Sequence, residues 1–363
     1  MGRRTAPLFL LGLLLAGCAS APPVLELQPD GPVSRVWPQP PERPRFRYVG
    51  ELRGQENFRS ARRGLARAGE RMLRLVVGLG ARRERPRELQ RPVGVAVDET
   101  SGRVFVADVS RQAVYVFDRR AGRLLIWERA GEDAAFLSPV GLAPTGDGGV
   151  WVSDSALGRV VRLDRDGRPV RVLKEGLERP TGLAWDGTVG DGTAGDGAAG
   201  RLYVADTAAD RIRVFDGEGR PLGVLGRPGE GPGELNGPTF LFLRAGRLYV
   251  ADTLNARIQA LDPRDGRPLL VFGRRGRYLG DTPRPKGVAV DQDGRIYVVE
   301  SYFDFLLVFD AQGRLLLPIG GTGSAPGQFY LPAGAWADGR DRVYVADSFN
   351  GRVVVLEYLR GGG

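Results

Sequence analysis

The stretch "GRLYVADTLNARIQALD", residues 246–262, repeats "GRLYVADTAADRIRVFD", residues 200–216, with 11 of 17 positions identical. Each copy holds two short apolar runs separated by a polar turn. Runs of this kind, rich in β-branched and aromatic residues and bounded by Gly, Asp and Asn, are typical of β-strands. The same phrase occurs six times along the chain, so the quoted stretch is one unit of an array.

The spacing of the units fixes their architecture. Each unit begins at a proline: Pro92, Pro139, Pro180, Pro238, Pro285 and Pro332. Successive prolines are 47, 41, 58, 47 and 47 residues apart, and most units hold three strong apolar runs and a weaker fourth. Four antiparallel strands in about 40 to 50 residues form one blade of a propeller. We therefore predict an all-β fold, a six-bladed β-propeller over residues 88–360.

The two ends of the array predict how the ring closes. The last unit ends after its third run, "RVVVLEYL" at 352–359, and lacks a fourth strand. An unpaired run, "RFRYVGEL" at 45–52, precedes the first unit. We expect the segment 45–56 to supply the outer strand of the sixth blade, because a ring closed in this way leaves no long strand edge open for aggregation.

The repeated residues resemble the NHL repeat. The pattern P-x-G-(V/L)-A-(V/W)-D, followed by (L/I/V)-Y-V-A-D-(S/T)-x-N-x-R-(V/I), agrees best at "YVADTLNARI" and "YVADSFNGRV" and extends over about residues 91–359. The resemblance implies a propeller, commonly six-bladed. Because such propellers serve in binding, in RNA recognition and in a few lyases, the resemblance predicts the fold more closely than the function.

Acids and arginines recur at fixed places in the units. The second run of each unit ends in an acid: Asp108, Asp154, Asp206, Asp252, Glu300 and Asp347. The third run begins with arginine in four units: Arg159, Arg211, Arg257 and Arg352. Units 1 and 5 have Ala113 and Phe305 there instead. We expect the acids and arginines to pair and to hold the turn backbone; the alternative is a ring of ligands at one mouth of the propeller.

The first residues predict export and lipid attachment. "MGRRTAPLFLLGLLLAGC" has a basic start and a short apolar stretch, which predicts a signal peptide over 1–17. "LAGC", ending at Cys18, resembles the lipobox of bacterial lipoproteins, which implies that Cys18 carries the lipid. Ala19 at the next position implies the outer membrane of a Gram-negative bacterium rather than the inner one. We therefore expect an exported protein, anchored by lipid in the cell envelope.

Two segments precede the propeller besides the closing strand. Residues 18–44 are rich in proline, which predicts a lipid-anchored tether. Residues 57–87 have the periodicity of a basic amphipathic helix. Its apolar face includes Leu65, Met72 and Leu79, and its basic face includes Arg63, Arg67, Arg71 and Arg74. Such a helix either contacts the membrane surface or packs its apolar face on the propeller, and the sequence leaves both open.

The residue types present restrict the chemistry. The chain has 0 histidines, which excludes Ser-His-Asp and Cys-His catalysis and removes the most common general base. "LDRDG" at 163–167 and "VDQDG" at 290–294 look like fragments of calcium loops but lack the closing glutamate. We therefore predict no catalytic residue, no metal site and no cofactor. The alternative function is that of a metal-dependent hydrolase or lactonase with a carboxylate-lined central channel.

Aromatic residues predict a partner surface on the loops of units 5 and 6. The candidates are Tyr302, Phe303, Phe305, Phe329, Tyr330 and Phe349, since aromatic side chains in neighbouring loops suit a protein interface. For Phe305 and Phe329 the alternative is that they point inward and seal the interface between blades, which leaves Tyr302, Phe303 and Phe349 as the expected exposed residues. The net charge of +9 does not indicate nucleic acid, because the excess lies in residues 59–87, which hold ten arginines against Glu70 and Glu84. The predicted function is therefore that of a non-catalytic propeller that binds an envelope protein or acts as a scaffold.

Overall fold

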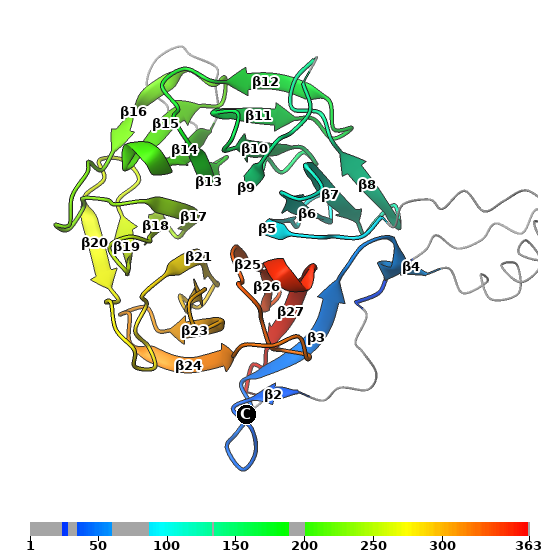
Figure 1. Cartoon of the computed structure of the whole chain (residues 1–363), viewed down its shortest axis with the longest axis vertical. Coiled ribbons are helices and arrows are strands. Elements are labelled where there is room, and N and C mark those ends of the chain that lie inside the picture. Colours follow the sequence, from blue (N-terminus) through cyan, green and yellow to red (C-terminus); the bar gives the residue numbers. More distant parts are fainter. Residues whose placement is uncertain (1–23, 28–34, 60–86, 133, 189–199, 362–363) are drawn as a thin grey trace, which may run out of the picture.

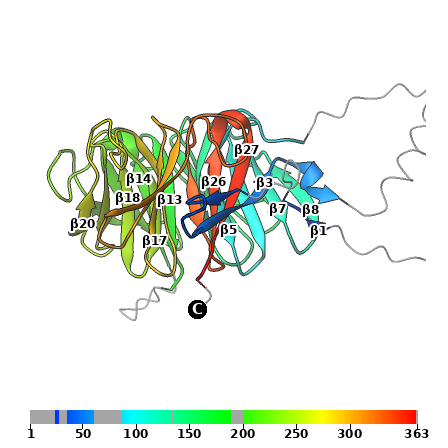
Figure 2. The same ribbon diagram turned by 90° about the horizontal axis from the view of Figure 1, so that it is seen from below.

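The computed structural model describes residues 24–27, 35–59, 87–132, 134–188 and 200–361. The described chain is a six-bladed β-propeller, with one sheet for each blade around a central axis (Figure 1). Seen edge-on, the blades form a disc (Figure 2). In the described part of the chain, no helix is both long and apolar enough to cross a membrane.

The first three blades each contain four antiparallel strands in sequence order. Blade 1 consists of β5 (Pro92–Asp98), β6 (Arg103–Asp108), β7 (Ala113–Asp118) and β8 (Arg123–Trp127). Blade 2 consists of β9 (Pro139–Pro144), β10 (Val150–Asp154), β11 (Arg159–Leu163) and β12 (Pro169–Leu173). Blade 3 consists of β13 (Pro180–Asp186), β14 (Arg201–Asp206), β15 (Arg211–Asp216) and β16 (Pro221–Leu225).

The remaining blades follow the same plan until the last. Blade 4 consists of β17 (Pro238–Arg244), β18 (Arg247–Asp252), β19 (Arg257–Leu261) and β20 (Pro268–Phe272). Blade 5 consists of β21 (Pro285–Val290), β22 (Ile296–Glu300), β23 (Phe305–Phe309) and β24 (Leu315–Gly320). Blade 6 combines β25 (Ala335–Ala337), β26 (Arg342–Asp347) and β27 (Arg352–Tyr358) with β3 (Phe46–Leu52) and β2 (Val36–Trp37).

Strand β3 closes the ring as the sequence predicts. It pairs antiparallel with β27, with Leu52 opposite Val353 and Phe46 opposite Tyr358. Phe46 and Leu52 are buried, because alternate side chains of β3 pack into the core on either side of the sixth blade. The first blade meets the last through contacts between β5 and the strands β25 and β26.

The segment before β3 differs from the prediction. Two short strands lie inside residues 18–44, which the sequence predicts as a tether: β1 (Val24–Leu25) and β2 (Val36–Trp37). β1 pairs with β4 (Phe58–Arg59), and β2 adds a fifth strand to blade 6. Trp37 is buried, so these described parts of the segment pack on the propeller rather than extend as a tether. The short 3-10 helices are η1 (Gln55–Asn57), η2 (Thr207–Ala209) and η3 (Ser348–Asn350).

The glycine of the repeated Pro-x-Gly phrase is required by a close approach between blades. A Cβ on Gly94 would lie 2.0 Å from the carbonyl oxygen of Val140, and a Cβ on Gly141 would lie 2.0 Å from that of Thr181. The inner strands of blades 1 and 2 thus approach the inner strand of the next blade more closely than a side chain at these two positions allows. The hydrophobic core lies between the facing sheets of adjacent blades, as in the cluster that joins blades 4, 5 and 6.

This close approach predicts a specific loss of stability. Gly141→Ala should destabilise the fold by about 1–3 kcal/mol, because the added methyl group forces the inner strands of blades 2 and 3 apart. The matched control is Gly223→Ala on the outer strand β16, where an added Cβ meets nothing within 4 Å. The control should leave the melting temperature unchanged or slightly raised. Equal melting temperatures for the two variants would contradict the packing argument.

Candidate functional site

The connections of the propeller emerge at two faces. The connections from the second to the third strand of each blade, and those from each outer strand to the next blade, lie on one side, which we call the loop face. Figure 1 looks onto this face, with η2 and η3 toward the viewer. The turns that join the first to the second strand and the third to the fourth strand of each blade lie on the other side, which we call the opposite face. The aromatic residues that the sequence predicts as a partner site belong to the loop face.

The repeated acids hold the loop that leads into their own blade. All six of them, Asp108, Asp154, Asp206, Asp252, Glu300 and Asp347, are fully buried. The Asp108 carboxylate accepts hydrogen bonds from the backbone N–H groups of Gln90 and Arg91, at 2.6 and 3.0 Å. Equivalent bonds reach Asp154 from Leu137 and Ser138. Because each carboxylate is used within its blade, these acids hold the blade architecture together.

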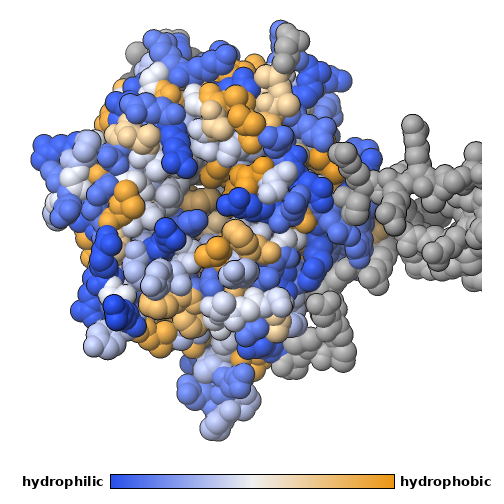
Figure 3. Space-filling view, viewed as in Figure 1, coloured by the Kyte–Doolittle hydropathy of each residue, from blue (hydrophilic) through white to orange (hydrophobic). Residues whose placement is uncertain are grey.

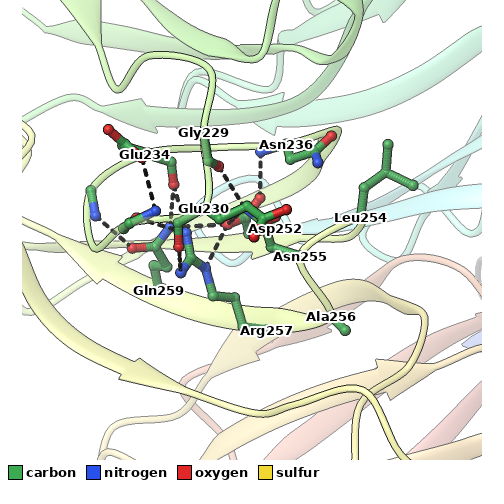
Figure 4. Close-up of polar contacts among 12 residues, drawn as sticks. Gly229, Glu230, Glu234, Asn236, Asp252, Leu254, Asn255, Ala256, Arg257 and Gln259 are labelled. Atoms are coloured by element: carbon green, nitrogen blue, oxygen red, sulfur yellow. Dashed lines mark hydrogen bonds and ion pairs between the residues drawn. The ribbon is translucent and has the colours of Figure 1, made fainter.

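In blade 4 the acid also pairs with its arginine (Figure 4). The Arg257 Nε donates to Asp252 Oδ2 at 2.8 Å, and the two strands place these residues directly opposite each other. The two other nitrogens of the Arg257 guanidinium donate to the backbone carbonyls of Glu230, Gly231 and Glu234. One guanidinium therefore ties the acid to the loop that leads into the blade.

Blade 6 uses the same arrangement and adds a second acid. The Arg352 guanidinium donates to Asp347 at 2.8 Å and to Glu51 of β3 at 2.9 Å. It also donates to the carbonyls of Ala325 and Gln328. Sequence reasoning missed Glu51, although an acid inside the apolar run "RYVGEL" was a signal that this strand meets a buried cation.

The predicted pairing is weaker or missing in the other blades. The closest approach of Arg211 to Asp206 in blade 3 is 3.6 Å. In blade 2, the Nε of the buried Arg159 has no hydrogen-bond partner in the described part of the chain. Blades 1 and 5 have Ala113 and Phe305 at this position, directly opposite their acids. The repeated pair is thus complete in blades 4 and 6 only, among the residues that the structure describes.

The predicted aromatic residues form two pairs on the loop face. Tyr302 and Phe303 contact each other edge to face, with ring centroids 4.8 Å apart. Tyr330 and Phe349 do the same at 5.5 Å. The exposed fractions of Tyr302, Tyr330 and Phe349 are 64%, 46% and 51%, so these three side chains are open to solvent. Phe303 is partly buried.

The other two predicted aromatic residues face inward. Phe329 is fully buried, and its ring packs so closely on Gly320 that a Cβ there would lie 2.5 Å from it. Phe329 is therefore wrong as a surface residue, because its ring fills the core beneath the loop. Phe305 is partly buried and packs against the core of blades 4 to 6.

The loop face carries further exposed apolar side chains that sequence reasoning missed. They are Leu137, Leu157, Leu254, Tyr278 and Leu279. In the described part of the chain, the exposed large apolar side chains lie on this face, on the outer strands or at Val24, and none lies in the turns of the opposite face. Figure 3 shows a hollow at the centre of the loop face, bordered by both apolar and hydrophilic side chains. Their signal in the sequence was weak, because each is a single residue in a polar loop.

A lysine lies on an inner strand near the centre of the loop face. Lys286 is the second residue of β21, and it is partly buried. Burial lowers the pKa of Lys286, and the positive charges of Arg284 and Arg91 lower it further. Arg91 also stacks on the Phe349 ring, with its guanidinium carbon 5.2 Å from the centroid. The centre of the loop face is therefore positively charged beside the aromatic pairs.

The channel mouth at the opposite face forms a cavity of about 260 Å³. Its lining comes from the ends of the inner strands and is mainly apolar, with Phe242 and Trp336 in edge-to-face contact at 5.1 Å. Asp98 and Glu99 supply the acids and Arg244 supplies a cation. The Asp98 carboxylate is used by its own turn, where it accepts bonds from Thr100 and Ser101. Among the described residues, no group of three or more side chains is arranged to hold a metal ion.

Several predicted site residues lie outside the described residues. These are Cys18 and the helix residues Arg63, Arg67, Arg71, Arg74, Leu65, Met72 and Leu79. Lipid attachment at Cys18 and membrane contact by the segment 57–87 therefore stay predictions.

The NHL repeat family profile matches residues 89–117, which cover the loop into blade 1 and its first strands. The chain is a six-bladed β-propeller with an NHL repeat. No curated protein sequence matches this propeller.

Solved structures share the fold of the propeller at low identity. One is a catalytically inactive virginiamycin B lyase from Staphylococcus aureus with quinupristin, at 16% identity and a TM-score of 0.52, covering 74% of this chain and 95% of that chain. A gluconolactonase from Xanthomonas campestris has 19% identity and a TM-score of 0.54, covering 75% and 87%. A protein of unknown function from Bacteroides thetaiotaomicron has 15% identity and a TM-score of 0.56, covering 75% and 70%. At these identities the likeness concerns the fold alone.

Proposed function

We propose that this propeller is a non-catalytic binding or scaffold module of the bacterial cell envelope, and that a protein partner binds the loop face of blades 5 and 6. The observation that carries the proposal is the unequal distribution of exposed apolar side chains. Of the two faces of the disc, only the loop face carries them among the described residues, and the others lie on the outer strands or at Val24. Apolar side chains concentrated on one face are typical of a protein-binding surface.

The chemistry of this face supports a protein partner. Tyr302, Tyr330 and Phe349 offer large contact areas at a small cost in side-chain entropy, as residues that dominate binding energy do. Arg91 beside Phe349 adds a cation next to an aromatic ring. Blades 5 and 6 hold both aromatic pairs, so one partner segment laid across their loops contacts all three exposed rings.

The N-terminal segments complete the proposal. Lipid on Cys18 would attach the protein to the membrane, in keeping with the lipobox "LAGC". The basic segment 57–87 would lie against anionic headgroups, where each arginine near the surface contributes about 1 kcal/mol. A diacylated Cys18 would place two acyl chains in the membrane, which is enough for a stable anchor, and the basic segment would add to it.

The proposal predicts the behaviour of a loop-face variant. With Tyr302, Tyr330 and Phe349 changed to Ser in the intact lipoprotein, the yield of the main cross-linked partner in cell envelopes should fall at least tenfold. Mass spectrometry of the cross-linked products measures this loss. The matched control changes Leu222 and Val224 to Ser, which are exposed on the outer strand β16 away from the loop face, and it should keep the partner.

Two further comparisons separate the parts of the proposal. Cys18→Ser should leave the membrane fraction and lose incorporated fatty acid, whereas the loop-face variant should keep both. Unchanged partners in a loop-face variant that melts like the wild type would exclude this face as the interface.

The alternative function, a metal-dependent hydrolase or lactonase, would use the central channel. The gluconolactonase among the similar structures shows that this fold supports such an enzyme. The channel mouth here is lined mainly by apolar side chains, and its two acids come from one turn. Lactone hydrolysis that calcium stimulates and that Asp98→Asn abolishes would favour the enzyme.

A further inference from the structure

The repeat unit contains a site for one guanidinium group. In blade 4, Arg257 occupies this site, paired with Asp252 at 2.8 Å and bonded to three carbonyls of the preceding loop. In blade 6, Arg352 occupies the equivalent site, paired with Asp347 at 2.8 Å and bonded to two loop carbonyls. The site therefore consists of a buried carboxylate at the end of the second strand and a loop whose carbonyl groups point toward it.

Blade 5 has the acid without the arginine. Glu300 stands opposite Phe305 in the same strand register in which Asp252 stands opposite Arg257. The Glu300 carboxylate accepts backbone hydrogen bonds from Arg284 at 2.8 Å and from Phe303 at 2.8 Å. Tyr302 adds a third backbone donor, and in the part of the chain that the structure describes no lysine or arginine side chain forms an ion pair with Glu300. A fully buried carboxylate thus has backbone partners and no cation.

A cavity lies beside Glu300 and Phe305, which stand in the strand register of Asp252 and Arg257 in blade 4. Its volume is about 140 Å³, several times the ~30 Å³ that one water molecule takes in the liquid. Its lining includes Glu300, Phe303, Phe305 and the loop residues Tyr278 and Asp281. Tyr278 and Leu279 at this loop are exposed, with Tyr278 78% accessible, so the cavity opens on the loop face.

Blade 1 shows that a missing arginine does not by itself leave such a cavity. Ala113 replaces the arginine there, and Asp108 accepts four backbone hydrogen bonds. Arg111 from the adjacent turn donates to the carbonyl of Glu88, at 3.1 Å, and the Tyr115 hydroxyl donates to the same oxygen. Blade 1 therefore satisfies its loop from within, whereas blade 5 leaves a cavity beside its acid.

We propose that the blade-5 cavity binds an arginine side chain of the protein partner, which pairs with Glu300 as Arg257 and Arg352 pair with the acids of their own blades. This proposal rests on the proposed function, since it names the group with which the partner docks on the loop face. A guanidinium suits the cavity better than an ammonium group, because its planar set of donors reaches a carboxylate and loop carbonyls at once.

The surroundings of Glu300 favour a cation. Burial, the largest effect, raises the pKa of Glu300, and the nearby Asp304 raises it further. An arginine in the cavity would remove much of this penalty by placing a positive charge beside the carboxylate. Phe303, Phe305 and Tyr278 add aromatic rings to the lining, and an arginine over such a ring is attracted to its face.

The chain's own Arg277 is the competing occupant. Arg277 lines the cavity and belongs to the loop that leads into blade 5, but its side chain is exposed, and among the described residues it forms no ion pair with Glu300. The neighbouring Arg274 is committed to Asp281, at 2.7 Å. Arg275 donates to the carbonyl of Leu254, at 2.9 Å. The partner's arginine therefore meets a cavity that the arginines of this loop leave unfilled.

The test uses a small probe and two substitutions of one residue. The probe is N-acetyl-L-arginine methylamide, and the matched control probe is its citrulline analogue, which has the same shape without the charge. Binding to the purified propeller is measured by nuclear magnetic resonance titration. Phe305→Arg restores the chain's own guanidinium and fills the cavity, whereas Phe305→Leu removes the ring without adding a cation.

The expected results separate the cavity from the rest of the loop face. Wild type and Phe305→Leu should bind the arginine probe, and Phe305→Arg should bind it at least tenfold more weakly. Wild type and Phe305→Leu should also bind the citrulline probe at least tenfold more weakly than the arginine probe. Equal binding by Phe305→Arg and wild type would overturn the proposal. The proposal would also be overturned if the arginine probe bound Arg277→Ser but not the wild type, because Arg277 would then be the group that fills the cavity in the wild type.

Cross-linking in envelopes distinguishes this proposal from the proposed function. Phe305→Arg should reduce the yield of the cross-linked partner at least tenfold. Its melting temperature should be no lower than that of the Phe305→Leu variant. If Phe305→Arg keeps the partner but the change of Tyr302, Tyr330 and Phe349 to Ser loses it, the loop face is the interface and the arginine proposal is wrong. If both variants keep the partner, the loop face itself is wrong.

Discussion

A chain that begins at residue 53 should melt at least about 10 °C lower than the wild type and should aggregate, because it lacks strand β3. Phe46, Tyr48 and Leu52 of this strand are buried, and the loss of a buried aromatic or aliphatic side chain costs about 2–5 kcal/mol each. Without β3, the whole of β27 becomes an exposed strand edge, which is a template for pairing with another chain. Thermal unfolding and light scattering measure the two effects.

The matched control begins at residue 35. It lacks residues 1–34, as the first shortened chain does, but keeps β2 and β3. It should lose only the contacts of β1, such as the pairing of Leu25 with Phe58, and melt within a few degrees of the wild type. Similar melting temperatures for the two shortened chains would show that the ring does not depend on β3.

Arg352→Ala should lower the free energy of unfolding by about 3–5 kcal/mol at neutral pH, because it leaves the buried Asp347 carboxylate without its cation and removes one of the two arginines that pair with Glu51. Arg352 is fully buried and pairs with both Asp347 and Glu51. It joins the last strand of the propeller to the strand that closes it. Denaturation with urea measures the loss.

The control for this prediction is Arg211→Ala in blade 3. Arg211 lies 3.6 Å from Asp206 with its side chain 30% exposed, so its removal should cost about 1 kcal/mol or less. Equal losses in the free energy of unfolding of the two variants would show that neither the burial of Arg352 nor its second acid, Glu51, adds to stability.

The loss in Arg352→Ala should also depend on pH. Burial raises the pKa of Asp347, and Arg352 is one of the groups that oppose this rise. Without the arginine, the folded-state pKa moves further above the unfolded value, so the folded protein holds its proton more tightly. The loss in the free energy of unfolding is therefore largest at neutral pH. It shrinks as the pH falls toward the pKa of about 4 that an aspartate has in the unfolded chain.

The fold was predictable because the evidence for it is repeated. Six copies of one strand pattern, at nearly equal spacing, specify blades, and the unpaired run at 45–52 specifies their closure. The two short strands before it were not predictable. β1 and β2 contain two residues each, and their apolar side chains lie in a proline-rich segment whose composition is typical of a tether.

The candidate site was predictable only in part. The sequence indicated the loops of blades 5 and 6, and Tyr302, Tyr330 and Phe349 are exposed there. It left open whether Phe329 is exposed or seals the interface between blades, because the side on which a loop side chain lies depends on the path of the backbone. Phe329 turns inward under its loop, against Gly320.

By itself, the sequence determined the number of blades, the closing strand and the positions of the repeated acids and arginines, because strand period and repeat length are local properties of the chain. Only the tertiary structure decided which of these arginines meets its acid. Arg257 and Arg352 do so because the preceding loops bring carbonyl groups around them, and Glu51 reaches Arg352 from more than 300 residues away in the chain. The cavity beside Glu300 is likewise a tertiary feature, since it arises where Phe305 stands in place of an arginine and the loop around it keeps its position.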